Sequence, residues 1–412
     1  MLGERIREIR KKKKMTLEVL AGEELTKGML SLIENNKAQP SMESLAYIAE
    51  RLGVEIGDLL EEVSTQELRQ ILEKAEKLYN QKSESETDKY KLLLTLIEPY
   101  IEKLTQGYES ARLLEIYSRS LYNEKIEGWL DFSNRAAKMY DEMNLTAKRA
   151  NISIFWAMEK FVEHDYTESL NILLRERDKL EATHVYIDPM TRVDFDYHEA
   201  ILHYAVGNSK SATKVLESAI HFSKEHRIFF RIDDLYRLAV ANALMTHDTE
   251  KKDHYSTKLK QYGEFADDIR STLFYELFQI MSLINEKQDY VKALEKIDHY
   301  LSNPHMTEVY EIWFLLEKGK AFYELGHFQE ALLFLEKVTI HSWVHHPFDF
   351  SLLYITDTYK ALCHFELGKE NEALQFAKKA VENYSTLAPT PFQDFANETY
   401  NTILEKISSN VE

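Results

Sequence analysis

The sequence predicts an all-α protein in which a small five-helix domain is followed by a long array of paired helices. Of its 412 residues only 12 are glycine and 7 are proline, the two residue types that interrupt helices most strongly. Short turn signals return about every 40 residues over most of the chain, which is typical of helical repeats. A chain of this length exceeds one compact core. We therefore expect a small domain at 1–63, a linker helix and loop at 64–88, and a repeat domain at 89–412.

Charge is distributed unevenly along the chain. The whole sequence has 51 Lys and Arg against 69 Asp and Glu, a formal net charge of −18 at pH 7. Residues 1–60 hold ten residues of each sign, so the whole excess of acid lies beyond residue 60. Seven of those ten basic residues fall within residues 1–14. Because an acidic bulk repels nucleic acid, we expect any DNA contact to be confined to one face of the first domain.

The composition also bears on cellular location. The single cysteine, Cys363, excludes an intramolecular disulfide and suits a reducing compartment, and within YKALCHFELG it reads as a buried core residue. The first residues, MLGER, carry charge with no apolar segment behind them, unlike a signal peptide. No apolar run approaches the roughly 18 residues that a membrane-spanning helix needs. We expect a soluble cytoplasmic protein without membrane contact.

The first 60 residues have the spacing of five short helices, each marked by a residue that favours a helix end. In order, we expect an amphipathic helix from about residue 4, a helix at 17–21 capped by Thr16, a helix capped by Thr26, a helix begun by Pro40 and Ser41 and ended by Gly53, and a turn of helix at 56–60. The residues expected to face inward are Ile6, Ile9, Leu17, Leu20, Leu30, Ile33, Leu45, Ile48, Ala49 and Leu52. This order of helices predicts a helix-turn-helix domain that reads DNA.

In a helix-turn-helix domain the third helix enters the major groove, and outward side chains near its start meet base edges. A lysine there can donate to guanine, a serine to a base or the backbone, and a methionine can touch a thymine methyl. The candidate base-reading residues are Lys27, Gly28, Met29, Ser31 and Asn35. The candidate phosphate-binding residues, which give salt-sensitive affinity without sequence reading, are Thr16, Asn36, Lys37, Lys11, Lys12, Lys13 and Lys14. The expected partner is a double-stranded DNA operator.

Three stretches carry a resemblance to a known family. IREIRKKKKMT, LAGEELTKGMLSLIE and PSMESLAYIAERLGV together resemble the Xre/Cro-like helix-turn-helix family over residues 3 to 60. That family usually has glutamine after the cap of the second helix, where it can brace a phosphate, whereas this chain has Glu18. The departure puts one phosphate contact in doubt. The alternative interpretation is a domain kept for dimerisation or protein docking, and the adjacent basic run favours DNA binding over it.

The segment after this domain predicts a connecting helix and a loop. Residues 64–80 form a charged amphipathic pattern whose apolar stripe is Leu68, Ile71, Leu72, Ala75 and Leu78. Residues 81–88, QKSESETD, have no apolar anchor and predict a loop. The segment is either a passive spacer or a hinge that sets the distance between two DNA-reading heads of a dimer, and the sequence does not separate these alternatives.

Several turns beyond residue 160 share one pattern: a short Gly, Asp or Asn turn, an aromatic or small residue, and then a helix that starts with Ala or Leu. LGHFQEAL from Leu325 and LGKENEAL from Leu367 are the clearest copies. The small residue after each turn falls at positions 169, 212, about 252, 293, 331 and 373, which are spaced by 43, 40, 41, 38 and 42 residues. A weaker copy is expected near Leu130, and a capping pair within 88–120. This regular phase predicts stacked helix pairs.

The turns resemble the tetratricopeptide repeat, which also has a small residue seven positions further on, as at Ala219 and Ala380. The resemblance implies a right-handed α-superhelix whose first helices line a concave face. Asn and Gln there can pair with both an N–H and a C=O of an extended peptide, and aromatics can form pockets between them. The candidate peptide-binding residues are Asn151, Asp194, Tyr197, Tyr204, Asp234, Arg237, Asn242, Gln279, Asn285 and Lys320, with Phe155, Trp313 and Tyr323 as further outward positions. Each of them taken alone also fits ordinary packing or solvated surface.

Taken together, the two parts resemble the peptide-pheromone-responsive regulators of Gram-positive bacteria, the Rap/NprR/PlcR/PrgX group with Rgg. The length and the shortened turn in LAGEELTKGMLSLIE make NprR-like proteins the most similar. The resemblance implies a cytoplasmic homodimer, with a tetramer as a further peptide-bound state, that binds a short imported quorum-sensing peptide and so changes its DNA binding. The alternative that it implies is a Rap-like protein that docks and inhibits a phosphorelay response regulator, for example in sporulation, with DNA binding secondary.

The sequence does not predict an enzyme. It contains neither a GxxxxGK[ST] phosphate loop nor GxGxxG. The pair His198-Glu199 is followed by His203, one position too late for a zinc-binding HExxH motif. Two of His341, His345 and His346, around Trp343, could share a metal, but without a cysteine or a spaced carboxylate pair they favour a polar patch at a helix end. We expect no cofactor, no metal and no catalytic residue.

Overall fold

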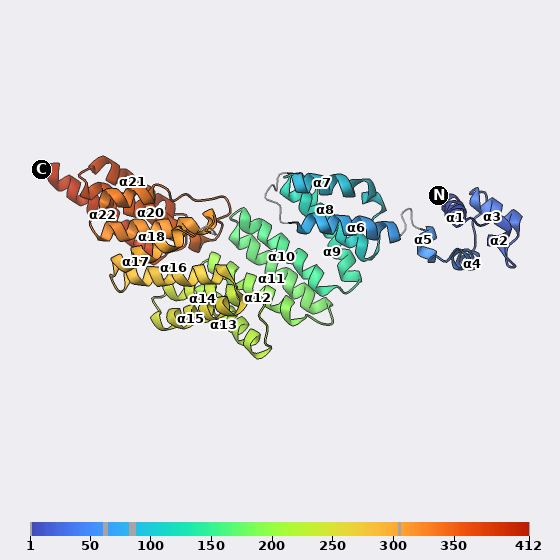
Figure 1. The fold of residues 1–412 in the computed structure, drawn as a ribbon, viewed down its shortest axis with the longest axis horizontal. Helices are drawn as coiled ribbons and strands as arrows, with labels where there is room; N and C mark the ends of the chain where they lie inside the picture. Colours follow the sequence, from blue (N-terminus) through green and yellow to red (C-terminus); the bar gives the residue numbers. More distant parts are fainter. Residues whose placement is uncertain (1, 61–64, 82–87, 304–305, 412) are drawn as a thin grey trace. The chain divides into compact units, whose positions relative to one another are not determined.

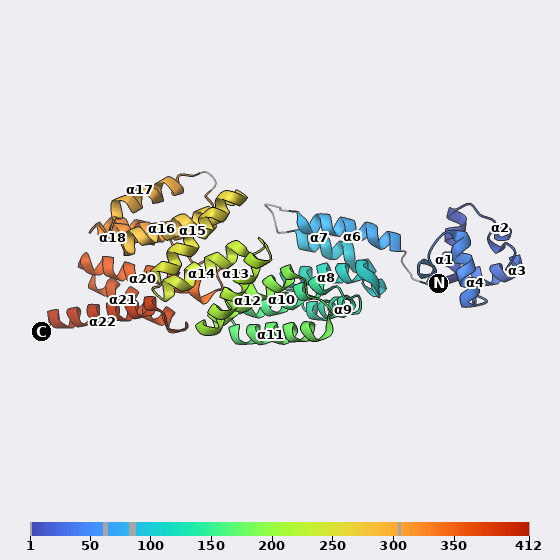
Figure 2. The same cartoon turned by 90° about the horizontal axis from the view of Figure 1, so that it is seen from below.

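The computed structural model describes residues 2–60, 65–81, 88–303 and 306–411. Across these residues the chain forms 22 α-helices, one 3-10 helix and no strand, so the all-α prediction is confirmed (Figures 1 and 2). The chain divides into two compact units, residues 1–152 and residues 153–412. None of the described helices combines the length and the apolar character needed to cross a membrane.

The first five helices form a small domain with its own core. They are α1 (Leu2–Lys12), α2 (Leu17–Ala21), α3 (Lys27–Glu34), α4 (Met42–Leu52) and α5 (Ile56–Leu60). Thr16, Thr26 and Ser41 each accept a hydrogen bond from a backbone N–H in the first turn of the following helix, and Gly53 ends α4 in the left-handed region. The core residues are Ile6, Leu20, Leu30, Ile33, Leu45, Ile48, Ala49 and Leu52, with Ile9 and Leu17 partly buried against them. The predicted helices, caps and inward face are confirmed.

The helices that follow are α6 (Thr65–Asn80), α7 (Lys89–Ile97), η2 (Glu98–Lys103), α8 (Gly107–Asn123), α9 (Trp129–Glu142) and α10 (Thr146–Val162). Helix α6 packs against both α7 and α8, and its Glu76 pairs with Arg112 of α8 (2.6 Å). Most of its predicted apolar stripe is buried. Helix α6 therefore belongs with the helices after it and is not a separate spacer. Most of the predicted loop at 81–88 lies outside the described residues.

The second unit is a succession of helix pairs. Its remaining helices are α11 (Tyr166–Thr183), α12 (Pro189–Ala205), α13 (Ser209–Glu225), α14 (Ile232–Met245), α15 (Thr249–Ala266), α16 (Ile269–Asn285), α17 (Tyr290–Leu301), α18 (Glu308–Glu324), α19 (Phe328–Leu335), α20 (Pro347–Glu366), α21 (Glu370–Tyr384) and α22 (Pro391–Val411). Each even-numbered helix from α12 to α20 packs against the helix after it, and both views show these helices following one another in chain order (Figures 1 and 2).

The turn inside each pair has one geometry, which confirms the predicted register. Six turns place a residue in the left-handed region two positions before the second helix of the pair begins: His164, Gly207, His247, Gln288, Gly326 and Gly368. The fourth residue of each of those six helices is buried: Ser169, Ala212, Lys252, Ala293, Ala331 and Ala373. Lys252 is the one long side chain in that set, and its ammonium pairs with Glu286. Only a small residue, or one with a charge partner, fits against the first helix here.

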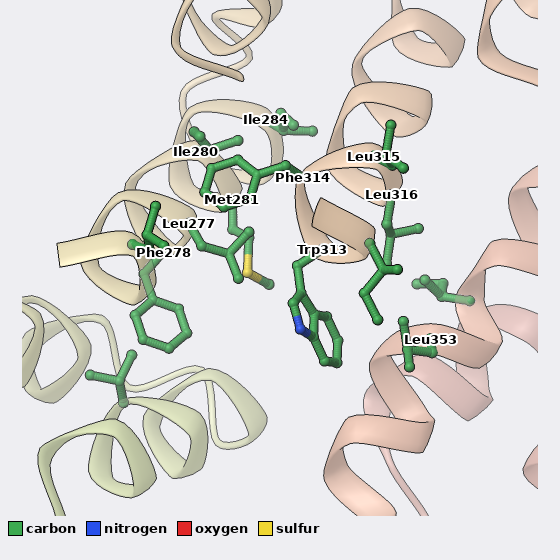
Figure 3. Close-up of a cluster of buried hydrophobic side chains, with 14 of the residues drawn as sticks. Leu277, Phe278, Ile280, Met281, Ile284, Trp313, Phe314, Leu315, Leu316 and Leu353 are labelled. Atoms are coloured by element: carbon green, nitrogen blue, oxygen red, sulfur yellow. The ribbon is translucent and has the colours of Figure 1, made fainter. Parts of the chain in front are cut away.

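The core of the second unit runs between the first helices of neighbouring pairs. Figure 3 shows apolar side chains of α16 and α18 directed toward one another, with Leu277 and Met281 near the indole of Trp313. Leu353 of α20 joins the same cluster. Adjacent pairs therefore share one continuous apolar seam, as stacked repeats require.

Candidate functional sites: the DNA-reading helix and a cavity in the repeats

The third helix of the first domain presents the side chains predicted to read DNA. Leu30 and Ile33 of α3 are buried in the core, which turns the opposite face outward. Lys27, Gly28 and Met29 in its first turn are exposed. Asn35 is also exposed, whereas Ser31 is half-buried. Helix α3 thus has the orientation of a recognition helix, with its first turn available to a groove.

Glu18, the departure from the family pattern, has a partner on the recognition helix. Its carboxylate accepts a hydrogen bond from the ammonium of Lys27 (2.7 Å), and this bond lowers the pKa of Glu18. Both side chains are exposed. The ammonium of Lys27 thus already has a charge partner within the domain.

Two predicted phosphate-binding residues have roles inside the domain. The ammonium of Lys13 donates to the backbone carbonyls of Leu52 and Gly53 at the end of α4, a favourable place for a cation. The side-chain oxygen of Asn36 accepts from the backbone N–H of Gly3 (2.9 Å). The remaining candidates Lys11, Lys12, Lys14, Lys37 and Thr16 are exposed.

Arg10 and Glu34 form a buried ion pair that the sequence analysis did not identify. The Arg10 Nε and the second terminal nitrogen donate to the two oxygens of Glu34 at 2.6 and 2.8 Å. The first terminal nitrogen donates to the carbonyl of Met15 (2.8 Å). The hydrogen bond to Glu34 raises the pKa of Arg10. This bidentate pair fixes the recognition helix to α1.

A cavity in the second unit has a volume of about 460 Å³. Most of its wall comes from the first helices of successive pairs, α12, α14, α16, α18 and α20, and from the segment between α19 and α20; α10 and α22 also contribute. Its apolar lining includes Phe161, Tyr197, Ile201, Leu238, Phe274, Leu277, Phe278, Met281, Trp313, Leu316, Trp343, Phe348, Leu352, Ile355 and Phe392. Several of these also belong to the apolar cluster of Figure 3, so the cavity opens directly off the core.

Charged side chains on the cavity wall form a paired network. The Arg231 guanidinium contacts Asp194 and Asp234, each at 2.9 Å, and the Arg237 guanidinium also binds Asp234. The two guanidinium groups lie 4.8 Å from the ring centres of Tyr197 and Phe274 respectively. Further along the wall, the Lys320 ammonium contacts both oxygens of Glu317 at 2.9 Å.

Three histidines and one carboxylate complete the polar lining. Burial lowers the pKa of His198 and of His345 and lowers that of His346 to about 4, so all three are neutral at pH 7. Burial raises the pKa of Asp349 to about 6, although the charge of Arg237 opposes the shift. Asp349 lies in the first turn of α20.

Residues 336–346, which we call the strap, connect α19 to α20 and reach a turn far away in the sequence. The backbone carbonyl of His345 accepts a hydrogen bond from the Tyr166 hydroxyl (2.7 Å), and its ring contacts that of His164. The ring of His346 contacts the carbonyl of Ile201 (3.2 Å). The strap thus forms one side of the cavity and joins α20 to the turn between α10 and α11.

The predicted peptide-binding residues divide into three sets. Tyr197, Asp234, Arg237, Trp313 and Lys320 line the cavity. Tyr204 and Asn242 line a second cavity of about 230 Å³, and Asp194 reaches the first one through Arg231. The residues that line neither cavity are Asn151, Phe155, Gln279, Asn285 and Tyr323.

The histidines and the cysteine singled out in the sequence have ordinary surroundings. His341 stacks on Trp343, whereas His345 and His346 contact different elements as described. Among the described residues no three His, Cys, Asp or Glu side chains are grouped as metal ligands. Cys363 is buried, as predicted, and burial raises the pKa of its thiol to about 12.

The comparisons with known proteins support the assignment of the first domain most clearly. Residues 3–64 match a family model described as a helix-turn-helix domain, so the chain carries this domain where the sequence predicts it. No curated protein sequence matches the chain.

Among the solved structures to which the chain is similar are three regulators. The first is Bacillus thuringiensis PlcR in complex with the peptide PapR7 and DNA, with 19% identity, 65% of this chain and 95% of that chain covered, and a TM-score of 0.35. The second is the apo form of ComR from S. thermophilus, with 19% identity, 69% of this chain and 98% of that chain covered, and a TM-score of 0.32. The third is the SHP pheromone receptor Rgg2 of Streptococcus dysgalactiae, with 16% identity, 67% of this chain and 98% of that chain covered, and a TM-score of 0.31. PlcR and Rgg belong to the groups that the sequence resembles; the narrower resemblance to NprR-like proteins stays a prediction.

Proposed function

We propose that this protein is a DNA-binding transcription regulator whose repeat domain binds a short linear peptide and thereby changes its DNA binding. The observation that carries the proposal is the cavity of about 460 Å³ in a chain that also holds a helix-turn-helix domain. Cavities of about 300–1,000 Å³ with apolar walls and a few fixed polar groups are typical ligand sites. In this cavity the polar groups are the Arg231–Asp234–Arg237 network and Asp349.

An extended ligand suits the site better than a compact one. The 460 Å³ cavity and the 230 Å³ cavity share Leu238, Ala241, His346 and Phe348 in their walls, so they adjoin. A peptide extends by about 3.3–3.6 Å per residue and places successive side chains on opposite sides. Side chains of one peptide can therefore occupy both cavities, while its backbone meets polar groups such as Asn242 in the wall of the second cavity.

The ligand would act by favouring one arrangement of the repeat helices. Five first helices and the strap contribute to one cavity wall, so the spacing of these helices and the shape of the cavity are linked. A peptide shifts such an equilibrium only by its difference in affinity for the two arrangements, and a tenfold shift needs about 1.4 kcal/mol. Two or three added hydrogen bonds supply that amount. We expect a cytoplasmic homodimer, because paired helix-turn-helix domains read paired half-sites, with a tetramer as a further peptide-bound state.

The test is the affinity of the full-length protein for the DNA around its own gene, with and without peptide. The peptides are synthetic copies of the C-termini of small secreted reading frames beside that gene. Two of the four tryptophans, Trp313 and Trp343, line the cavity, so tryptophan fluorescence reports binding directly. A peptide that changes both the fluorescence and the DNA affinity is the expected result.

Two variants place the peptide in the proposed site. Asn242→Ala, in the wall of the second cavity, should weaken the peptide response, and Asn285→Ala, which is exposed and lines neither cavity, is the matched control. Equal loss in both variants, or in neither, would contradict this placement. Specific DNA binding that no peptide alters would leave a regulator with another effector. Absence of specific DNA binding would favour the docking of a phosphorelay response regulator instead.

A further inference from the structure

Asp349 differs from every other charged side chain on the cavity wall. Arg231, Asp234 and Arg237 are paired with one another, and Lys320 is paired with Glu317. The carboxylate of Asp349 lines the same cavity, but no side chain or backbone group that the structure describes forms a hydrogen bond or an ion pair with it. The cation that acts on it electrostatically, Arg237, is already bound to Asp234.

The charged network around the cavity carries an excess of negative charge. The carboxylates that line it or pair with its lining residues are Asp194, Asp233, Asp234, Glu317 and Asp349. The cations are Arg231, Arg237 and Lys320, and the lining histidines are neutral at pH 7. The lining itself holds three carboxylates and three cations, and the two carboxylates behind it, Asp194 and Asp233, bring the described network to five carboxylates against three cations. Because the wall is largely apolar, this excess is poorly screened.

The position of Asp349 in a helix does not by itself account for its place in the cavity. A carboxylate in the first turn of a helix interacts favourably with the helix dipole from an exposed position. Glu330, in the first turn of α19, is such a residue and is exposed. Asp349 is instead half-buried in the cavity wall, where burial raises its pKa to about 6. An unpaired carboxylate is costly to desolvate unless a cation joins it.

We propose that the peptide bound by this protein presents a cationic nitrogen to Asp349, either a free α-ammonium or the side chain of a lysine or arginine. The inference rests on the proposed peptide-binding function and specifies the charge of the ligand. The cation would form a charge-assisted hydrogen bond with the one free carboxylate of the wall. It would also offset the negative excess of the charged network around the cavity. Peptides that are neutral or acidic throughout would be rejected, since they leave Asp349 desolvated and unpaired.

The test is affinity selection by the full-length protein from a mixture of synthetic seven-residue peptides of random sequence, half of them N-acetylated. Retained peptides are identified by mass spectrometry. We expect the wild-type protein to enrich peptides that contain lysine or arginine, or the half with free amino ends, by tenfold or more over the input. Asp349→Asn should remove this enrichment while still retaining some peptides. Glu330→Gln, the exposed first-turn counterpart, should leave the enrichment unchanged.

The outcomes separate the two proposals. Retained peptides without cationic enrichment, or the same enrichment in Asp349→Asn, would overturn the role of Asp349 and leave peptide binding standing. Retention of no peptide by the wild-type protein would overturn both. A last measurement uses spermidine alone, a free polyamine, with tryptophan fluorescence as the readout. If spermidine changes the fluorescence of the wild-type protein but not that of Asp349→Asn, and no peptide is retained, then Asp349 binds a free amine and the peptide proposal is excluded. An unchanged circular dichroism spectrum establishes that Asp349→Asn is folded.

Discussion

The Arg10–Glu34 pair allows the stability of the DNA-reading domain to be tested separately from that of the repeats. The change Glu34→Gln keeps the shape of the side chain and removes its charge, which leaves the Arg10 guanidinium buried without a counter-ion. Both side chains are largely buried, and two hydrogen bonds of 2.6 and 2.8 Å join them. Removing one member of a buried pair costs about 3–5 kcal/mol. We expect about 3 kcal/mol, because glutamine can still accept one of the two bonds.

A loss of that size is large for a domain of this length. Native domains are stable by roughly 0.05–0.15 kcal/mol per residue, so residues 2–60 have only a few kcal/mol to lose. Hydrogen exchange of the full-length protein, followed by mass spectrometry, measures the effect region by region. In Glu34→Gln the amides of α3 and α1 should exchange much faster, specific DNA binding should fall, and the repeat helices should stay protected. The double change Arg10→Met with Glu34→Leu should restore most of the protection, because it removes the unpaired charge.

The matched control is the exposed ion pair of the same domain. Glu18→Gln breaks the contact with Lys27 at the surface, where an ion pair contributes little, and it should leave exchange unchanged. If Glu34→Gln exchanged like the wild-type protein, or if Glu18→Gln were equally affected, the buried pair would not be what holds α3 in place.

Three further predictions follow from single contacts. Asp349→Asn should stabilise the protein at pH 7.5, because the folded pKa of Asp349, about 6, lies above the ordinary value of 3.8. Protonation of Asp349 therefore adds stability to the wild-type protein as the pH falls from 7 toward 4, up to about 3 kcal/mol for a shift of about two units. Urea unfolding of the variant at several pH values should lack that gain, and an equal pH dependence in both proteins would refute the assignment. Tyr166→Phe removes the hydrogen bond to the strap (2.7 Å) and should cost about 1 kcal/mol with faster exchange in residues 336–346, whereas Tyr186→Phe, on an exposed side chain, should not. Lys27→Ala should relax or abolish specific binding of operator DNA, as expected of a base-reading residue, while Glu18→Gln, which frees Lys27, should raise affinity. Wild-type operator affinity in Lys27→Ala would count against the assignment of α3 as the recognition helix.

The register of the repeats could be predicted because residues close together in the sequence determine it. A left-handed turn residue and a buried residue, which is small in five of the six repeats, lie within six positions of one another, as at Gly326 to Ala331, and their spacing fixes where the second helix begins. The caps of the first domain are equally local. The predicted position at about 252 was correct although a lysine stands there, since the regular spacing set it and not the residue type.

The lining of the cavity could be predicted only in part, because it depends on which face of each first helix meets the cavity. On α16 the lining residues Leu277, Phe278 and Met281 lie on one stripe. Gln279 lies one residue off that stripe, and Asn285 is the last residue of the helix and is exposed. A choice based on the hydrogen-bonding ability of Asn and Gln selected a helix that lines the cavity, but not the side of that helix that faces the cavity.

The strap and Asp349 were missed for a different reason. Helix α19 has only eight residues, so the regular repeat spacing conceals a segment that leaves the helical pattern and enters the cavity. The signal was present in the histidines around Trp343, which the sequence suggested as a polar patch or a metal site. Their contacts join residues up to 181 positions apart, and no local pattern reports such pairings.

The contact between the strap and the turn at Tyr166 has a consequence for how the array comes apart. In a simple repeat protein each unit touches only its neighbours, so stability accumulates along the chain and the ends unravel independently. Here a bond between residues 179 positions apart closes the repeats between them into a loop. The repeats within that loop should melt as one block, and force applied to the ends of this unit should meet a single abrupt yield point instead of successive release of one pair after another.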